Sequence, residues 1–124
     1  MVGTKVVIID DDPDILKIGE LSLTGIAKWQ VSTASSSKEA FMVLNQAKPD
    51  LILLDTALPD IDGLSLMEKI RENQEFANTP VVLTTTRIEP GEEDFYISKG
   101  ATGLIEKPFN PETLVDQLVE KVNA

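Results

Sequence analysis

Four short apolar runs, each closed by a polar side chain, constrain the fold of this chain more than any other feature of its sequence. The first, Val6 to Asp10, continues into Asp11 and Asp12. The other three are LILLD (Leu51 to Asp55), VVLTT (Val81 to Thr85) and GLIEK (Gly103 to Lys107). Runs of this length that are apolar almost throughout are typical of strands buried on both faces of a parallel sheet.

Helix-length segments with recognisable start signals separate these runs. Asp12-Pro13 opens one helix, Ser36-x-x-Glu39 forms a capping box for another, and Asn110-Pro111-Glu112 opens the last. We place two further helices at about 63–74 and 91–99, and the mixed segment Gln30 to Ala34 reads as an edge strand. The last helix carries one apolar face, formed by Leu114, Val115, Leu118, Val119 and Val122. Strands that alternate with helices predict one three-layer α/β domain around a parallel sheet.

Composition narrows the class of protein. The chain has 124 residues, of which 42% are apolar, and this suits one folded domain with a core of ordinary size. No apolar run approaches membrane-spanning length, no signal peptide is visible, and cysteine is absent, so we expect a cytoplasmic protein. A formal charge of −10 repels nucleic-acid phosphates and anionic lipids, which argues against direct contact with either.

Ligands of an open parallel sheet bind at the carboxyl ends of its strands. The predicted strands deliver Asp10, Asp11, Asp55, Thr85 and Lys107 to that edge. Crowded carboxylates are relieved by protonation or by a cation. Because the chain has neither histidine nor cysteine, its oxygen-only ligands favour magnesium, manganese or calcium over zinc or copper.

Each of these side chains also has a simpler interpretation. Asp12, before Pro13, has the position of a helix N-cap, and Asp10 or Asp11 alone could play the same part. Asp60-x-Asp62-Gly63 reads as a turn followed by a helix start rather than as a metal loop. Caps and turns do not explain why aspartate, aspartate, threonine and lysine close four successive buried strands.

Taken together, these residues resemble the receiver domain of two-component response regulators. The resemblance covers essentially the whole chain, 1–124, as a single domain with no effector domain. It rests on the order and spacing of the acidic pair, Asp55, Leu58-Pro59, Asp62-Gly63, Thr85 and Lys107-Pro108-Phe109. It implies a flavodoxin-like fold with five parallel strands in the order 2-1-3-4-5. It also implies a signalling switch rather than an enzyme, in which the third-strand aspartate accepts a phosphoryl group from a histidine kinase or phosphotransfer protein.

Carried over to this sequence, the resemblance makes Asp55 the phosphoacceptor. It implies that Asp11, Asp55 and the backbone carbonyl of Ala57 bind Mg²⁺, with Mn²⁺ as a substitute, and that Asp10 acts through water. Lys107 would pair with Asp55 and then with the phosphoryl group, a cis peptide would join Lys107 to Pro108, and Thr85 would sense the phosphoryl oxygens.

Several positions depart from the family pattern. Leu58 stands where methionine is common, Thr84 replaces an apolar residue, and the branched Thr86 crowds the entrance where alanine or glycine is favoured. Leu104 occupies the switch position that often carries tyrosine or phenylalanine, so we expect a different readout of phosphorylation.

The resemblance also implies a downstream protein partner, which would bind about residues 91–122. We expect the protein to be a monomer or a weak dimer. A stand-alone regulator, or a receiver cut from a hybrid kinase, suits the chain.

Two other functions remain open on the sequence. A haloacid-dehalogenase-type phosphatase also uses an aspartyl phosphate, and Asp10-x-Asp12 after a strand resembles its opening motif. Against it, no acidic pair follows a later strand and no cap segment is present. A degenerate receiver could instead bind a partner without phosphorylation.

The single tryptophan, Trp29, follows a helix of about 14 residues, roughly 20 Å long. This placement predicts that its ring lies at the sheet edge opposite Asp55.

Overall fold

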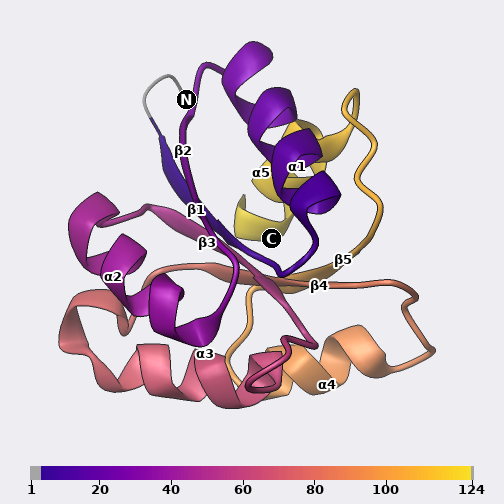
Figure 1. Ribbon diagram of the computed structural model, residues 1–124. Helices are drawn as coiled ribbons and strands as arrows, with labels where there is room; N and C mark the ends of the chain where they lie inside the picture. The colour runs from indigo at the N-terminus through magenta and orange to yellow at the C-terminus, as the bar shows by residue number, and fades with distance from the viewer. Residues whose placement is uncertain (1–3, 124) are drawn as a thin grey trace.

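Five parallel strands form the centre of the molecule. The computed structural model describes residues 4–123. The strands are β1 (Lys5–Ile9), β2 (Gln30–Ala34), β3 (Leu51–Asp55), β4 (Val81–Thr85) and β5 (Gly103–Glu106). Their order in the sheet is β2-β1-β3-β4-β5, and every neighbouring pair is parallel (Figure 1). The predicted flavodoxin-like α/β fold is confirmed.

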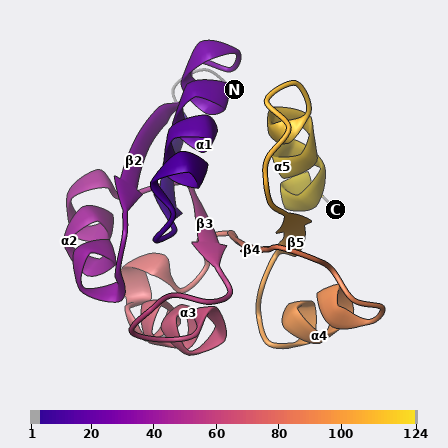
Figure 2. The same ribbon diagram turned by 45° about the vertical axis from the view of Figure 1, so that its right-hand side comes forward.

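Helices cover both faces of this sheet. They are α1 (Pro13–Gly25), α2 (Ser37–Ala47), α3 (Gly63–Glu72), α4 (Glu92–Ser98) and α5 (Leu114–Asn123), with a 3₁₀ turn η1 (Gln74–Phe76) after α3. Figures 1 and 2 show α1 and α5 on one face and α2, α3 and α4 on the other. No helix within residues 4–123 is both long and apolar enough to cross a lipid bilayer.

The core consists of two apolar clusters, one on each face of the sheet. Alternate residues of a strand point to opposite faces, so Val7 and Ile9 belong to the cluster under α2 and α3, whereas Val6 and Ile8 belong to the cluster under α1 and α5. All residues of β3 are buried. This two-sided burial explains why the central strands are apolar throughout instead of alternating.

Two of the three predicted helix starts are present, the second with one change of partner, whereas α5 begins at Leu114, after a turn over residues 111–113, rather than at Asn110-Pro111-Glu112. Asp12 caps α1 by accepting a hydrogen bond from the Asp14 N–H at 2.9 Å. Ser36 caps α2 by accepting from the Glu39 N–H at 3.2 Å. The Glu39 carboxylate then accepts from the N–H of Ser35, at 3.0 Å, rather than from that of Ser36. The second hydrogen bond of the capping box therefore uses the N–H of the residue before the N-cap instead of the N–H of the N-cap residue itself.

Helices α3 and α4 also differ from their predicted ranges. Helix α3 ends at Glu72 rather than Gln74, because Asn73 is extended (φ −82°, ψ 118°) and its side chain caps η1 through the Glu75 N–H. Helix α4 runs only over Glu92–Ser98, between Gly91 (φ 80°) and Gly100 (φ 108°). Positive φ suits glycine and is not helical, so these two residues bound the short helix.

Candidate functional site

Three carboxylates meet at the carboxyl edge of the sheet. Asp10 and Asp11 follow β1, and Asp55 ends the neighbouring strand β3. Asp10 and Asp55 are buried and Asp11 is exposed. Each offers an oxygen, and these three oxygens lie within 4.8 Å of one another. Among the described residues, this is the group of acidic side chains close enough to share one cation.

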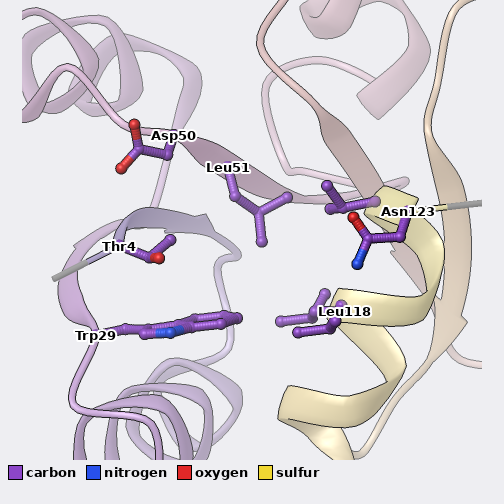
Figure 3. A pocket seen from close by; sticks show the side chains of 8 residues that line it. Thr4, Trp29, Asp50, Leu51, Leu118 and Asn123 are labelled. Atoms are coloured by element: carbon purple, nitrogen blue, oxygen red, sulfur yellow. The ribbon is translucent and has the colours of Figure 1, made fainter. Parts of the chain in front are cut away.

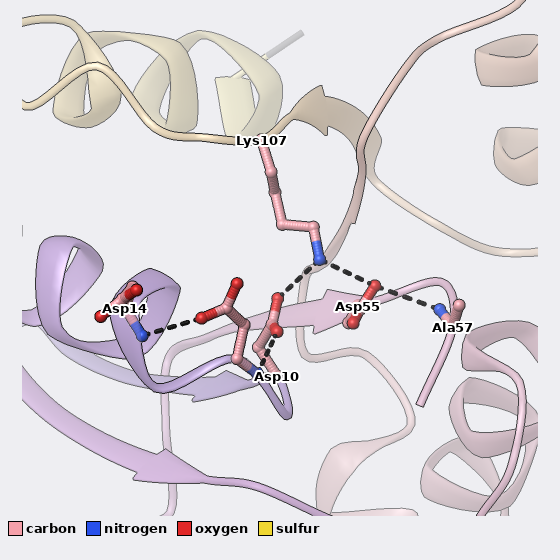
Figure 4. A network of polar contacts seen from close by, with 6 residues as sticks. Asp10, Asp14, Asp55, Ala57 and Lys107 are labelled. Carbon is pink, nitrogen blue, oxygen red and sulfur yellow. Dashed lines mark hydrogen bonds and ion pairs between the residues drawn. The ribbon is translucent and has the colours of Figure 1, made fainter. Parts of the chain in front are cut away.

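Lys107 places one ammonium between the two buried carboxylates (Figure 4). Its Nζ lies 2.8 Å from Asp10 Oδ2 and 3.1 Å from Asp55 Oδ1. The Lys107 side chain is only 10% exposed, and its backbone directly follows β5, the edge strand next to β4. The Lys107–Pro108 peptide bond is cis, which is the isomer implied by the family resemblance. The lysine therefore pairs with both carboxylates, not with Asp55 alone, and its single positive charge offsets one of their two negative charges.

The surroundings of Asp55 favour its protonated form more than water would. Burial raises the pKa of Asp55, the Ala57 N–H lowers it, and the charge of Asp10 raises it again. Lys107 lowers the pKa of Asp55, but the net direction is upward from the ordinary aspartate value. A nearby cation would offset this effect and keep the carboxylate ionised.

The pKa of Lys107 shifts in the direction that keeps its positive charge. Burial on its own would lower the pKa of this ammonium. Hydrogen bonds to Asp10 and Asp55, and their charges, outweigh burial and raise the pKa of Lys107 above its usual value. At neutral pH the edge therefore holds a protonated lysine against the acidic cluster.

Backbone contacts hold the acidic residues in place. The N–H of Asp10 donates to the carbonyl oxygen of Ala34 at 3.0 Å, and Asp10 Oδ1 accepts from the Asp12 N–H at 2.9 Å. Asp55 Oδ1 accepts from the Ala57 N–H at 3.1 Å. Asp12 is occupied as the cap of α1 and does not join the group of three carboxylates that could share a cation.

The loop after β3 contains the second acidic motif, and the structure gives both of its carboxylates local partners. Asp62 caps α3 by accepting from the Ser65 N–H at 2.9 Å, as the sequence predicts. Asp60 accepts hydrogen bonds from the hydroxyl and the N–H of Ser37, at the start of α2. The sequence did not indicate this second contact, because Ser37 and Asp60 lie 23 positions apart.

The three threonines at the end of β4 have different environments. Thr84 is buried, Thr85 is half-buried and Thr86 is exposed. Thr86 lines a small pocket beside Lys107, together with Asp12, Ile15 and Pro108. The side chain expected to crowd the entrance thus lies next to the lysine of the site.

Leu104, at the expected switch position, is part of the core. It is 1% exposed and lies opposite Leu83 in the β4–β5 ladder. Its N–H donates to Glu93 of α4 at 3.0 Å. The same carboxylate oxygen of Glu93 accepts from the ammonium of Lys121 in α5 at 2.6 Å. One glutamate therefore connects α4, β5 and α5.

Trp29 lies away from the acidic edge. Trp29 is 4% exposed, and it lines a pocket of about 290 Å³ with Thr4, Asp50 and residues near the end of α5 (Figure 3). Thr4 directly precedes β1 and Asp50 directly precedes β3. Trp29 therefore lies at the amino edge of the sheet, opposite Asp55, as its place after α1 predicts.

Comparisons with known proteins agree on the family of this chain. Residues 6–119 match the family model of the response regulator receiver domain. The phosphate regulon transcriptional regulatory protein PhoB of Pseudomonas aeruginosa is 34% identical over 121 residues, which are 95% of this chain and 51% of that protein. The transcriptional regulatory protein TrcR of Mycobacterium tuberculosis is 31% identical over 114 residues, covering 92% of this chain and 43% of that protein. The chain spans about half the length of these curated relatives.

Solved structures show the same architecture. The chemotaxis response regulator CheY4 of Vibrio cholerae superposes with a TM-score of 0.88 at 31% identity, covering 97% of this chain and 99% of that one. The BeF3-activated N-terminal receiver domain of RstA from Klebsiella pneumoniae gives a TM-score of 0.80 at 27% identity, with coverages of 98% and 100%. These matches favour the receiver interpretation over the haloacid-dehalogenase alternative.

Proposed function

Because the chain belongs to the response regulator receiver family, we propose that it is a phosphoryl-accepting switch whose acceptor is Asp55. A receiver domain is a module of two-component signalling rather than an enzyme in the ordinary sense. The observation that carries the proposal is the placement of Asp55. This buried carboxylate lies within 4.8 Å of two further carboxylates and 3.1 Å from the ammonium of Lys107.

The transfer itself asks little of the protein beyond positioning and charge. An oxygen of Asp55 forms a bond to phosphorus while the bond from phosphorus to the donor's imidazole nitrogen breaks, and that nitrogen keeps the electron pair. Lys107 can move from the Asp55 carboxylate to the new phosphoryl oxygens, because its long stem carries a compact charge. Thr85, half-buried at the end of β4, supplies a hydroxyl to the same oxygens.

The donor set fits a hard divalent cation. Its ligands are carboxylate oxygens, which magnesium prefers, and Mn²⁺ can take the same ligands. Asp11, Asp55 and the carbonyl of Ala57 would hold Mg²⁺ directly, and Asp10 would hold it through water. The bound cation would neutralise charge that builds up during phosphoryl transfer. Exposure of Asp11 leaves that side of the cluster open to solvent.

Phosphorylation should be read out on the face formed by α4, β5 and α5. The new phosphoryl group adds negative charge beside Thr85 and Lys107, at the ends of β4 and β5. None of the seven residues of α4 is buried, so this helix has little core contact to oppose movement. Thr85 ends β4, the strand before α4, and Leu104 lies in β5, the strand after it. We propose that they carry the change to this face in place of an aromatic switch residue.

The partners follow from the same proposal. A histidine kinase or phosphotransfer protein supplies the phosphoryl group, and a protein binds the face of α4, β5 and α5. We propose that residues 1–124 act as one receiver domain in the cytoplasm, as a monomer or weak dimer, without direct contact to nucleic acid. The formal charge of −10 supports the last point.

Intact-mass analysis after treatment with acetyl phosphate and Mg²⁺ tests the proposal. The protein should gain the mass of one phosphoryl group, and Asp55→Asn should not gain it. Asp50→Asn, directly before the first residue of the same strand, is the matched control and should be phosphorylated normally. The phosphorylated protein should also show altered amide exchange within residues 91–122.

Three results would contradict the proposal in different ways. A phosphoryl group mapped to Asp10 would revive the phosphatase alternative. No mass gain in the unmodified protein would support an unphosphorylated binding module. Exchange that changes only around residues 30–47 would refute the proposed route to α4, β5 and α5.

A further inference from the structure

We propose that Ser37 is a positioning residue for the cation site, acting through Asp60. This inference rests on the proposed function, because it concerns the cation that the acidic cluster would hold. Ser37 is the first residue of α2, and Asp60 lies in the loop between β3 and α3. Neither residue belongs to the group of three carboxylates that could share the cation.

The contact between them uses two donors of one residue. Asp60 Oδ2 accepts from the Ser37 N–H at 3.2 Å and also from the Ser37 hydroxyl. The N–H would be offered by almost any residue at this position, but the hydroxyl requires serine or threonine. The hydrogen bond from the hydroxyl is therefore the part of the contact that depends on having serine at this position.

Asp60, one partner of this contact, belongs to a loop whose backbone is closed by its own hydrogen bonds. The N–H of Gly63 donates to the Thr56 carbonyl at 2.8 Å, and the N–H of Leu58 donates to the Ile61 carbonyl at 3.2 Å. Ala57 and Asp62 form an antiparallel bridge across the loop. Asp60 lies inside this closed turn, so a tie to Asp60 also restrains Ala57.

The same loop connects directly to the acceptor. The Ala57 N–H donates to Asp55 Oδ1 at 3.1 Å, and the Ala57 carbonyl is the backbone ligand of the proposed cation site. A loop that shifts would change the orientation of both groups. Partners that orient the ligands of a metal commonly influence its affinity although they do not touch it.

Ser37, the other partner, lies on a segment whose backbone is hydrogen-bonded to the acidic pair. The Ala34 carbonyl, three residues before Ser37, accepts from the N–H of Asp10 at 3.0 Å. Ser36, between them, caps α2, so the start of this helix has a defined position. The segment from Ala34 to Ser37 is thus bonded to the β1 end at one point and to the β3–α3 loop at another.

The Ser37–Asp60 contact therefore links the two halves of the site. One half carries Asp10 and Asp11, and the other carries Asp55 and the carbonyl of Ala57. A cation bound between them needs a set spacing, and magnesium is demanding in its geometry. We infer that the hydroxyl of Ser37 holds this spacing before the cation arrives and so increases the affinity for Mg²⁺.

Calorimetric titration with Mg²⁺ tests the inference without any phosphorylation step. Ser37→Ala removes the hydroxyl and leaves the N–H contact, and its Mg²⁺ dissociation constant should rise about 3- to 10-fold, at or below the lower end of the effects known for outer partners of metal ligands. Ser37→Thr restores a hydroxyl and should bind Mg²⁺ nearly as the unmodified protein does. Ser35→Ala, the same exchange two positions earlier, is the matched control and should leave Mg²⁺ affinity unchanged.

Two further measurements separate positioning from a general loss of stability. In metal-free buffer the Ala57 amide should exchange faster in Ser37→Ala, while the melting temperature stays close to that of Ser35→Ala. Asp60→Asn should also weaken Mg²⁺ binding, and adding Ser37→Ala to it should cost less than it does alone, because both changes disturb one contact.

The outcomes are distinguishable. Unchanged Mg²⁺ affinity in Ser37→Ala, with binding intact in the unmodified protein, would overturn the role of Ser37 and leave the proposed function standing. Weakened binding that Ser37→Thr does not restore, or that accompanies an equal loss of stability, would also overturn it. Absence of Mg²⁺ binding in the unmodified protein would instead count against the proposed function.

Discussion

Replacing Lys107 with methionine removes one buried charge while keeping the length of the side chain, and its effect on stability follows from the geometry of the site. Lys107 Nζ lies 2.8 Å from Asp10 Oδ2 and 3.1 Å from Asp55 Oδ1. The side chains of Asp10 and Asp55 are only 1% and 6% exposed, so water cannot replace the ammonium easily. We expect Lys107→Met to lower the free energy of unfolding by about 3 kcal/mol at neutral pH without metal, the low end of the cost of removing one partner from a buried pair.

The pKa shift of Asp55 determines how the stability loss of Lys107→Met changes with pH. The pKa of Asp55 is already raised by burial, so its ionisation costs folded-state stability as pH rises from the unfolded aspartate pKa, about 4, through the folded one. Without Lys107, which lowers the pKa of Asp55, this cost grows. The difference between the two proteins should therefore be largest near neutral pH and shrink below about pH 4, where the Asp55 carboxyl is protonated in both the unfolded and the folded state.

Urea unfolding followed by Trp29 fluorescence measures this difference. Trp29 is 4% exposed and lies at the opposite edge of the sheet, so unfolding changes its environment but the substitution does not. Lys17→Met is the control, because Lys17 is an exposed lysine of α1. Asp55→Asn should be at least as stable as the unmodified protein in metal-free buffer, since it removes a buried carboxylate and leaves the pair between Lys107 and Asp10.

Three results would refute this reasoning. The first is a loss at pH 7 no larger than that of Lys17→Met. The second is a loss that grows toward acid pH. The third is a strong destabilisation by Asp55→Asn without metal, which would mean that the clustered carboxylates do not oppose one another as the structure indicates.

Two further predictions concern the cation and the far edge of the sheet. Asp11→Ala should weaken Mg²⁺ binding much more than Asp12→Ala, whose expected effect is the loss of a helix cap worth about 1 kcal/mol; equal losses of affinity in calorimetry would mean that the ligands are wrongly assigned. Mg²⁺ should leave Trp29 fluorescence nearly unchanged while calorimetry shows binding, because the ring lies at the edge opposite Asp55. Quenching that saturates with the calorimetric curve would show that the cation's effect crosses the domain.

The strands and the edge that carries the site could be predicted from sequence because both depend on local patterns. Four short segments that are apolar almost throughout must be buried, and their alternation with helices makes the sheet parallel. The carboxyl ends of such strands share an edge, so Asp10, Asp55 and Lys107 were expected near one another before any distance was known. The caps at Asp12 and Asp62 were equally predictable, since a cap depends on two or three neighbouring residues.

Contacts between distant segments were decided only by the tertiary structure. Lys107 is shared by Asp10 and Asp55, Ser37 reaches Asp60, and Glu93 joins Leu104 to Lys121. Each contact depends on how far packed helices and loops stand from one another, and that spacing is set by side chains elsewhere in the core. The side chain of Lys121, for example, passes over Gly103 where an added Cβ would lie 2.8 Å from it. Local patterns thus determined which residues reach the edge of the sheet, and packing of the whole domain decided which of them touch.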